Sequence, residues 1–245
     1  KESSAASDVY KRQVVLVAGV ADELQAQEKR QGWIKRLRYR RELRRELQGE
    51  IQLSGAFALY PMAVKWAEEF RKIHPKVRID ISAGGAGKGI TDALAKVVDL
   101  GMVSRDIYPQ ELEKGAFPIA VVKDAVVPTI NSNNPLIDQI LATGLKQQVA
   151  QDLWIHTTAR TWGDVLGTGS TIPVHVYTRS DACGAAETFA AWLGAKQEDL
   201  EGTAVFGDPG VTSVVQRDKV GIGFNNIAYA YDINSKKPYR HIAVI

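Results

Sequence analysis

Three turns rich in glycine and alanine are the segments of this sequence best suited to chemistry. They occupy residues 54–58, 84–90 and 179–185, each between an expected strand and an expected helix. At such a turn, free backbone N–H groups meet the positive end of the helix dipole, and small residues let an oxyanion approach the backbone closely. Arg105 and Arg179 stand at the ends of expected strands. The pattern predicts an anion site built from turns and arginines.

Other kinds of ligand chemistry fit the sequence poorly. Gly87-Lys88 is similar to part of a P-loop, but residue 82 is Ser where that motif needs Gly, and residue 89 is Gly where it needs Ser or Thr. The GxGxxG pattern of dinucleotide-binding folds is missing after the first strand. The four histidines are scattered without the spacing of a zinc site. We therefore expect no NTPase activity, no cofactor and no metal.

Cys183 is the one cysteine of the chain, and it raises an alternative. It lies just before an expected helix, where the helix dipole can lower the pKa of a thiol. With His175 or Glu187 it could form a catalytic nucleophile. The simpler interpretation is a small residue packed into a turn. We favour packing, because no base with a fixed orientation is evident, and we expect the protein not to be an enzyme.

The elements that must position these turns alternate between strand and helix. They are strands at 50–53, 77–82, 99–103 and 173–177, and helices at 59–73, 90–97 and 185–193. Such alternation is typical of α/β folds with largely parallel sheets.

Length and composition suit one large domain or two modest lobes. The chain has 245 residues, of which 45% are hydrophobic and 24% charged, and this excludes a disordered tail, a collagen-like repeat and a disulfide scaffold. Its net charge of +3 is unevenly distributed. Residues 1–50 hold 12 Lys/Arg and 8 Asp/Glu, whereas the remainder holds 19 and 20. The basic character therefore belongs to the first fifth and does not indicate nucleic-acid binding by the rest.

Residues 1–49 form an atypical basic leader with several open interpretations. The apolar run 14–20 is too short for a transmembrane helix, although the preceding Lys11-Arg12 makes it weakly similar to a signal peptide. Residues 29–45 hold nine basic residues and one acidic residue, which predicts a solvated helix or a helix that binds anionic lipid or nucleic acid. Residues 8–13 resemble a translated sequencing adaptor, so the leader can also be artefactual.

Four sequence blocks carry a family resemblance. They are, in order, LSGAFALYPMAVKWAEEF, ISAGGAGKGITDAL, VDLGMVSRDI and VYTRSDACGAAETF. Together they resemble the substrate-binding proteins of phosphate-type ABC importers, over about residues 50–245. Two further landmarks of that family are IHTTARTWGDVLG and VGIGFNNIAYAY.

The resemblance implies a type II periplasmic-binding-protein fold, in which two α/β lobes are joined by crossing strands and the ligand sits in the cleft between them. It implies a first lobe at 50–122, to which residues 231–245 return, and a second lobe at 123–230. Family members extend beyond the position of Ile245. We therefore expect a fragment that lacks its C-terminal segment, with an incomplete first lobe.

The family's phosphate pocket carries over only in part. Its Thr-Phe pair corresponds to Phe57 and Ala58, the serine of its second turn to Ala86 or Gly87, and its Ser-Asp pair to Ser104-Arg105. In its last turn, Cys183 and Ala185 replace Ser and Thr, while Arg179 and Gly184 are kept. The candidate ligand-binding residues are Phe57, Ala58, Ala86, Gly87, Ser104, Arg105, Arg179, Cys183, Gly184 and Ala185.

We therefore expect a receptor that binds an inorganic oxyanion, phosphate first, and delivers it to a membrane-embedded ABC permease. Backbone amides would hold the anion, Arg105 and Arg179 would supply charge, and Ser104 a hydrogen bond. An acceptor carboxylate rejects a fully deprotonated anion, so Arg105 in its place leaves sulfate, molybdate, tungstate or a small carboxylate as alternatives. The resemblance implies a periplasmic or cell-surface location, and we expect a monomer that binds no nucleic acid.

Overall fold

The computed structural model describes residues 10–18, 47–232 and 234–245, and the chain divides into two compact units. The N-terminal lobe comprises residues 14–121, and the C-terminal lobe comprises residues 1–13 and 122–245. Each lobe combines a sheet with helices, which confirms the α/β class. Among the described residues, no helix has both the length and the apolar character needed to cross a membrane.

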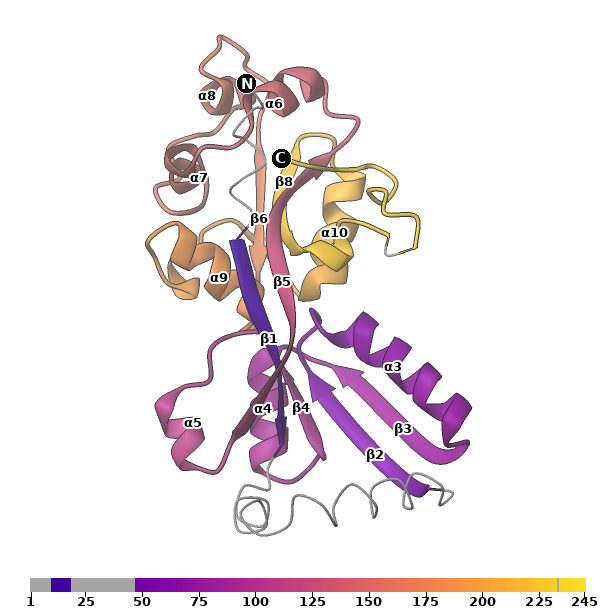
Figure 1. Cartoon of the computed structure of the whole chain (residues 1–245). Coiled ribbons are helices and arrows are strands. Elements are labelled where there is room, and N and C mark those ends of the chain that lie inside the picture. Colours follow the sequence, from indigo (N-terminus) through magenta and orange to yellow (C-terminus); the bar gives the residue numbers. More distant parts are fainter. Residues whose placement is uncertain (1–9, 19–46, 233) are drawn as a thin grey trace, which may run out of the picture. The chain divides into compact units, whose positions relative to one another are not determined.

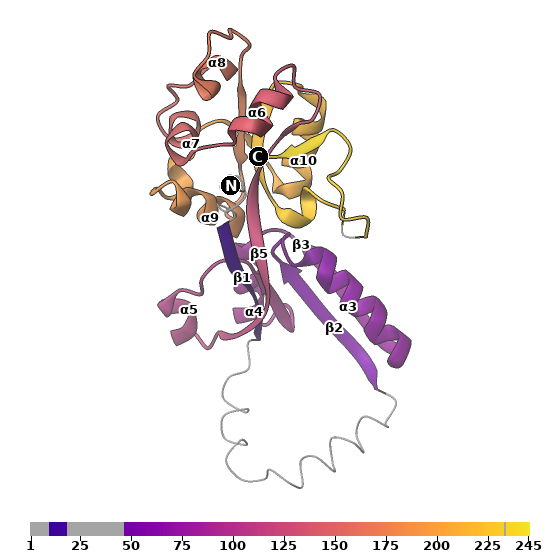
Figure 2. The ribbon, with the colours of Figure 1, turned by 45° about the horizontal axis from the view of Figure 1, so that its top comes forward.

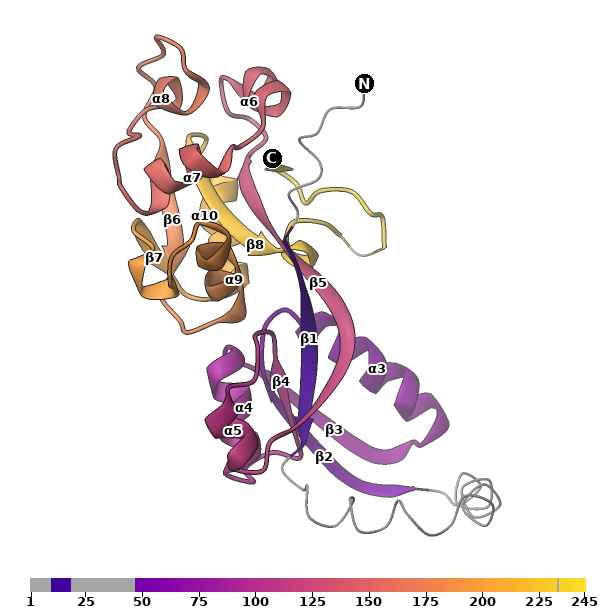
Figure 3. The same ribbon diagram turned by 60° about the vertical axis from the view of Figure 1, so that its left-hand side comes forward.

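The N-terminal lobe is built on a sheet with the strand order β3-β2-β4-β1. Its elements are β1 (Tyr10–Ala18), β2 (Gln48–Gly55), α3 (Tyr60–Ile73), β3 (Lys76–Ala83), α4 (Ala86–Leu94), β4 (Leu100–Val103), α5 (Pro109–Glu113) and the start of β5 (Phe117–Asn131). Strands β3 and β4 run parallel to β2, whereas β1 runs antiparallel to β4. Helices α3 and α4 lie on opposite sides of this sheet (Figures 1 and 3).

The sequence of α3 explains its ends. Pro61 lies in the first turn, where a missing N–H costs no helical hydrogen bond, and Ala63 and Ala67 provide the buried face. The helix ends at Ile73, just before His74-Pro75. A residue before proline is disfavoured in the helical conformation, so Pro75 limits the helix and lets β3 begin at Lys76.

The described part of the basic leader holds one whole element and the first two residues of β2. Residues 10–18 form β1, whose backbone at 15–18 pairs with 100–103 of β4. The leader expected at 1–49 thus contributes a strand to the N-terminal lobe, because a second strand satisfies the open backbone edge of β4. The helix expected within 29–45 and the adaptor-like residues 8 and 9 lie outside the described residues.

The C-terminal lobe is built on a sheet with the strand order β5-β8-β6-β7. Its further elements are α6 (Ile137–Thr143), α7 (Gln147–Trp154), α8 (Trp162–Leu166), β6 (His175–Arg179), α9 (Gly184–Trp192), β7 (Thr203–Val205), α10 (Gly207–Arg217), β8 (Gly221–Asn226) and β9 (Ile242–Val244). Helices α7 and α9 lie on one side of the sheet and α10 on the other (Figure 2). Trp154, Phe189 and Phe224 form the centre of the larger core, and Phe189 stacks on Phe224 at 4.4 Å.

The C-terminal segment differs from expectation. Residues 231–245 were expected to return to the first lobe, but β9 pairs antiparallel with residues 129–131 of β5, inside the C-terminal lobe. The physical reason is apolar burial. Ile242 is 3% exposed and packs with Val211 and Val215 of α10, so the segment covers the apolar face that α10 presents.

Candidate functional site

The turns at 54–58 and 84–90 lie beside the end of β4 in the N-terminal lobe. We call this end of the sheet, where β2, β3 and β4 finish, the sheet edge. Gly55, the last residue of β2, pairs with Ala83 of β3 and with Met102 of β4. The N–H groups of Gly84 and Gly85 both donate to the carbonyl oxygen of Gly55, at 2.9 and 3.1 Å. The three strands therefore end together, and the turns that follow them lie side by side.

Close backbone packing fixes α4 at this edge. A Cβ atom on Gly89 would lie 2.3 Å from the carbonyl oxygen of Met102 and 2.9 Å from the Cα of Gly55. A Cβ atom on Gly101 would lie 2.3 Å from the carbonyl oxygen of Gly89. Carbon and oxygen atoms do not approach so closely, so both positions require glycine. These glycines let the start of α4 rest directly against β2 and β4.

Helix amides are the donors that this edge offers. The first i→i−4 bond of α4 joins the N–H of Gly89 to the carbonyl oxygen of Gly85, at 3.3 Å. The N–H groups of Ala86 and Gly87 precede that bond and have no acceptor within the helix. Ala58 lies directly before Leu59, the N-cap residue of α3. Since the ends of β2 and β3 pair, the turns that carry Ala58, Ala86 and Gly87 follow neighbouring strand ends, where helix dipoles favour an anion.

Ser104 and Arg105 follow β4 but have different surroundings. Ser104 is 3% exposed, and its hydroxyl has no hydrogen-bond partner among the residues that the structure describes. The guanidinium of Arg105 donates to both carboxylate oxygens of Glu111, at 2.7 and 2.9 Å, and lies 4.1 Å from the ring centre of Tyr108. Arg105 was expected to supply charge to a ligand. Instead Glu111 balances that charge, and Arg105 holds the pKa of Glu111 below its ordinary value.

Arg179 lies in a buried network of carboxylates in the C-terminal lobe. Its side chain is 0% exposed, and its Nε and Nη2 donate to the two carboxylate oxygens of Asp181, at 2.9 and 2.6 Å. Its Nη1 donates to Asp208 at 2.8 Å. Although burial opposes it, Asp208 and Asp181 hold the pKa of the guanidinium above its ordinary value. One cation is thus shared by two carboxylates.

This network joins three elements and one turn, and it was not expected from the sequence. Asp208 also accepts hydrogen bonds from the backbone and the side-chain amide of Asn226, at 2.8 and 2.7 Å. Asp181 also accepts one from the N–H of Gly207, at 3.0 Å. The network therefore ties β6, the turn before α9, α10 and β8 together. Asp181 lies two residues after Arg179 and was visible in the sequence, whereas nothing local marks Asp208.

Cys183 packs into the turn before α9. It is 5% exposed, and its Sγ accepts a hydrogen bond from the N–H of Ala186, at 3.5 Å, as the helix cap. Burial raises the pKa of the thiol to about 12, so the lowering expected from the helix dipole is outweighed. His175, a suggested base, bonds Asp218 at 2.6 Å instead. These contacts favour the packing role over a nucleophile, and Gly184 and Ala185 follow Cys183 as the first residues of α9.

Comparison with known proteins confirms the family resemblance. The phosphate-binding protein PstS of Xylella fastidiosa is 28% identical over 205 residues, which cover 74% of this chain and 54% of the relative. PstS 2 of Streptococcus pneumoniae is 34% identical over 88 residues, covering 36% of this chain and 30% of the relative. The chain thus spans about half the length, or less, of these curated relatives.

Comparison with solved structures supports the same family resemblance. A crystal structure from Clostridium perfringens, described as a phosphate ABC transporter substrate-binding protein with bound phosphate, superposes with a TM-score of 0.69 at 25% identity. The match covers 80% of this chain and 75% of that one. A family model described as a PBP superfamily domain matches residues 42–239. The chain therefore belongs to the PBP superfamily.

Proposed function

We propose that the protein is a receptor that binds an inorganic oxyanion, phosphate first, and delivers it to a membrane-embedded ABC permease. The observation that carries the proposal is the meeting of two glycine-rich turns with the end of β4 at one sheet edge. Backbone amides at helix starts suit oxyanions because they supply several donors and a positive dipole without competing for a proton. The named relatives are phosphate-binding proteins, which supports phosphate as the first candidate.

The structure supports a division of roles among the expected residues. The amides of Ala58, Ala86 and Gly87 and the hydroxyl of Ser104 are the donors of the N-terminal lobe. The amides of Gly184 and Ala185 offer the same kind of donor in the C-terminal lobe. By contrast, Arg105 and Arg179 are positioning residues, whose charges are balanced by Glu111, Asp181 and Asp208.

The carboxylates near this sheet edge are poorly placed to select one oxyanion over another. The hydroxyl of Ser54, at 2.6 Å, and the ammonium of Lys88 both donate to Oδ2 of Asp92, on α4. Glu111 is likewise held by Arg105. A carboxylate that is already paired with a cation accepts the proton of an oxyanion less well, so such a site distinguishes a protonated from a fully deprotonated oxyanion poorly. We therefore propose that sulfate binds as well as phosphate. We also propose that the receptor works outside the cytoplasmic membrane, as its similarity to phosphate-binding proteins of ABC importers suggests.

Titration calorimetry with phosphate tests this function. Replacing Ser104 by alanine is expected to weaken phosphate binding by about 10-fold or more, because a hydrogen bond to a charged group contributes roughly 1.5–3 kcal/mol. Ser82→Ala is the matched control, since the hydroxyl of Ser82 bonds the carbonyl oxygen of Leu53 within the sheet. Absence of binding of phosphate, sulfate, molybdate and tungstate to the wild-type protein would refute the proposed function.

A further inference from the structure

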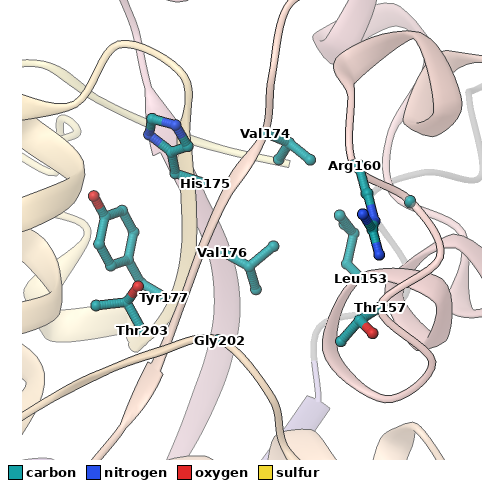
Figure 4. A pocket seen from close by; sticks show the side chains of 10 residues that line it. Leu153, Thr157, Arg160, Val174, His175, Val176, Tyr177, Gly202 and Thr203 are labelled. Atoms are coloured by element: carbon teal, nitrogen blue, oxygen red, sulfur yellow. The ribbon is translucent and has the colours of Figure 1, made fainter.

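A cavity of about 550 Å³, largely open to solvent, lies along β6 in the C-terminal lobe (Figure 4). It is lined by Leu153, Thr157, Ala159, Arg160, Val174, His175, Val176, Tyr177, Gly202 and Thr203. None of the residues proposed to bind the oxyanion lines it. Its volume falls in the range of small-molecule sites, roughly 300–1,000 Å³. The cavity is therefore large enough to be a site in its own right.

Arg160 brings a positive charge to one wall of this cavity. In Figure 4, Val174 and Val176 point from β6 toward the wall that carries Arg160 and Leu153. Among the residues that the structure describes, the guanidinium of Arg160 has no ion-pair partner, in contrast to Arg105 and Arg179.

Backbone contacts hold that wall in place. The N–H of Arg160 donates to Asp164 at 2.9 Å, and its carbonyl oxygen accepts from the N–H of Val174 at 3.1 Å. The loop that carries Arg160 is thereby tied both to α8 and to Val174, the residue directly before β6. These contacts fix the backbone of Arg160, whereas the residue itself is exposed, and an exposed cation without a counter-charge in the described chain is a potential anion ligand.

Two hydroxyl groups add to the donors of the cavity. The side chains of Thr157 and Thr203 have no hydrogen-bond partner in the described part of the chain. Thr157 has a φ of 53°, in the left-handed region that a β-branched residue rarely adopts. This conformation closes the end of α7, since the N–H of Thr158 donates to the carbonyl oxygen of Asp152 at 2.9 Å. The side chains of His175 and Tyr177 lie on the other side of β6, where both bond Asp218, at 2.6 and 2.8 Å.

From this combination we propose a second ligand site, for a small organic anion that carries a carboxylate or a phosphate group on an apolar body. A guanidinium binds either group with two parallel hydrogen bonds. Leu153, Ala159, Val174 and Val176 would cover the apolar body and gain from its burial. Inorganic phosphate has no such body, so it is expected to bind here much more weakly than phenyl phosphate or benzoate.

Titration of the whole chain with benzoate and with phenyl phosphate, followed by backbone amide resonances, tests the proposal. Saturable shifts are expected at residues 157–160 and 202–203. Arg160→Gln should weaken binding about 10-fold or more, and Thr203→Val by less. Arg217→Gln is the matched control, because Arg217 is exposed on α10 and has no ion-pair partner in the described chain. It should leave binding unchanged.

The titrations with benzoate and with phenyl phosphate identify the class of ligand. Stronger binding of benzoate indicates a carboxylate, and stronger binding of phenyl phosphate indicates a phosphate ester. The proposal is overturned if neither compound binds the wild-type protein, or if Arg160→Gln binds both as tightly as the Arg217→Gln control. Titration with inorganic phosphate in the same experiment separates this site from the oxyanion site, because its shifts are expected at residues 58, 86 and 87.

Discussion

Replacement of Arg179 by methionine is expected to lower the free energy of unfolding by about 3–5 kcal/mol, the cost of breaking a buried ion pair from one side. Methionine keeps much of the side-chain volume but leaves Asp208, which is 0% exposed, without its cation. Asp181 loses its two-pronged bond in the same step. Chemical denaturation at neutral pH measures the change directly.

Three further variants distinguish the loss of this ion-pair network from a nonspecific effect of replacing an arginine. Arg217→Met removes an exposed arginine of the same lobe and should change stability by less than about 0.5 kcal/mol. Arg179→Lys keeps the charge but loses the two-pronged geometry, so its effect should be intermediate. Asp208→Asn combined with Arg179→Met should recover part of the loss, because the fully buried carboxylate of Asp208 is then neutral and only Asp181 lacks its cation. Equal stability of Arg179→Met and Arg217→Met would show that the network does not stabilise the lobe.

The network also determines the direction in which the stability of the protein changes with pH. Burial alone would raise the pKa of Asp181, but hydrogen bonds from Arg179 hold it below its ordinary value. A carboxylate with a lowered folded-state pKa stabilises the protein above its unfolded-state pKa, roughly 4, and that contribution is lost as the pH falls further. The gap in stability between the wild type and Arg179→Met should therefore shrink below about pH 4.

The second large effect is expected at Gly89. Gly89→Ala should lower the free energy of unfolding by about 1–3 kcal/mol, although alanine favours helices by about 1 kcal/mol over glycine. The added Cβ would meet three backbone atoms, the carbonyl oxygens of Met102 and Ser54 and the Cα of Gly55, at 2.3, 3.0 and 2.9 Å. Backbone cannot rotate away as a side chain can, so α4 must move from the sheet. Thermal unfolding measures the loss, and phosphate affinity should fall with it.

Gly169→Ala provides the control for this substitution. A Cβ atom at Gly169 meets nothing within 4 Å, and the residue does not have a positive φ, so alanine should be tolerated there. If Gly89→Ala were as stable as Gly169→Ala and bound phosphate like the wild type, the close approach of α4 to β2 and β4 would have no role in shaping the edge.

The local parts of the site could be predicted from the sequence. The turns at 54–58 and 84–90 follow short strands, and glycine there marks the close approach that the structure shows between Gly55 and Gly89. The α/β class follows from the alternation of elements. These features depend on neighbouring residues, so periodicity and turn chemistry are enough to find them.

The distant parts could not be predicted. The partner of Arg179 in α10 lies 29 residues away, and no local pattern links Asp208 to the end of β6. Cys183 shows the same limit, since its sequence position suggests a lowered pKa while burial by distant packing raises it. Glu111 is the exception. It lies six residues after Arg105, in the first turn of α5, where sequence inspection could have found it.

The central claim is that backbone amides at one edge of the N-terminal lobe bind the oxyanion. The most direct test is a titration of the ¹⁵N-labelled chain with inorganic phosphate, followed residue by residue through amide resonances. We predict saturable shifts that are largest at Ala58, Ala86 and Gly87, with the amide of Ser104 also shifted. Saturable shifts confined to the Arg160 cavity, or no saturable shift at any of these amides, would contradict the account.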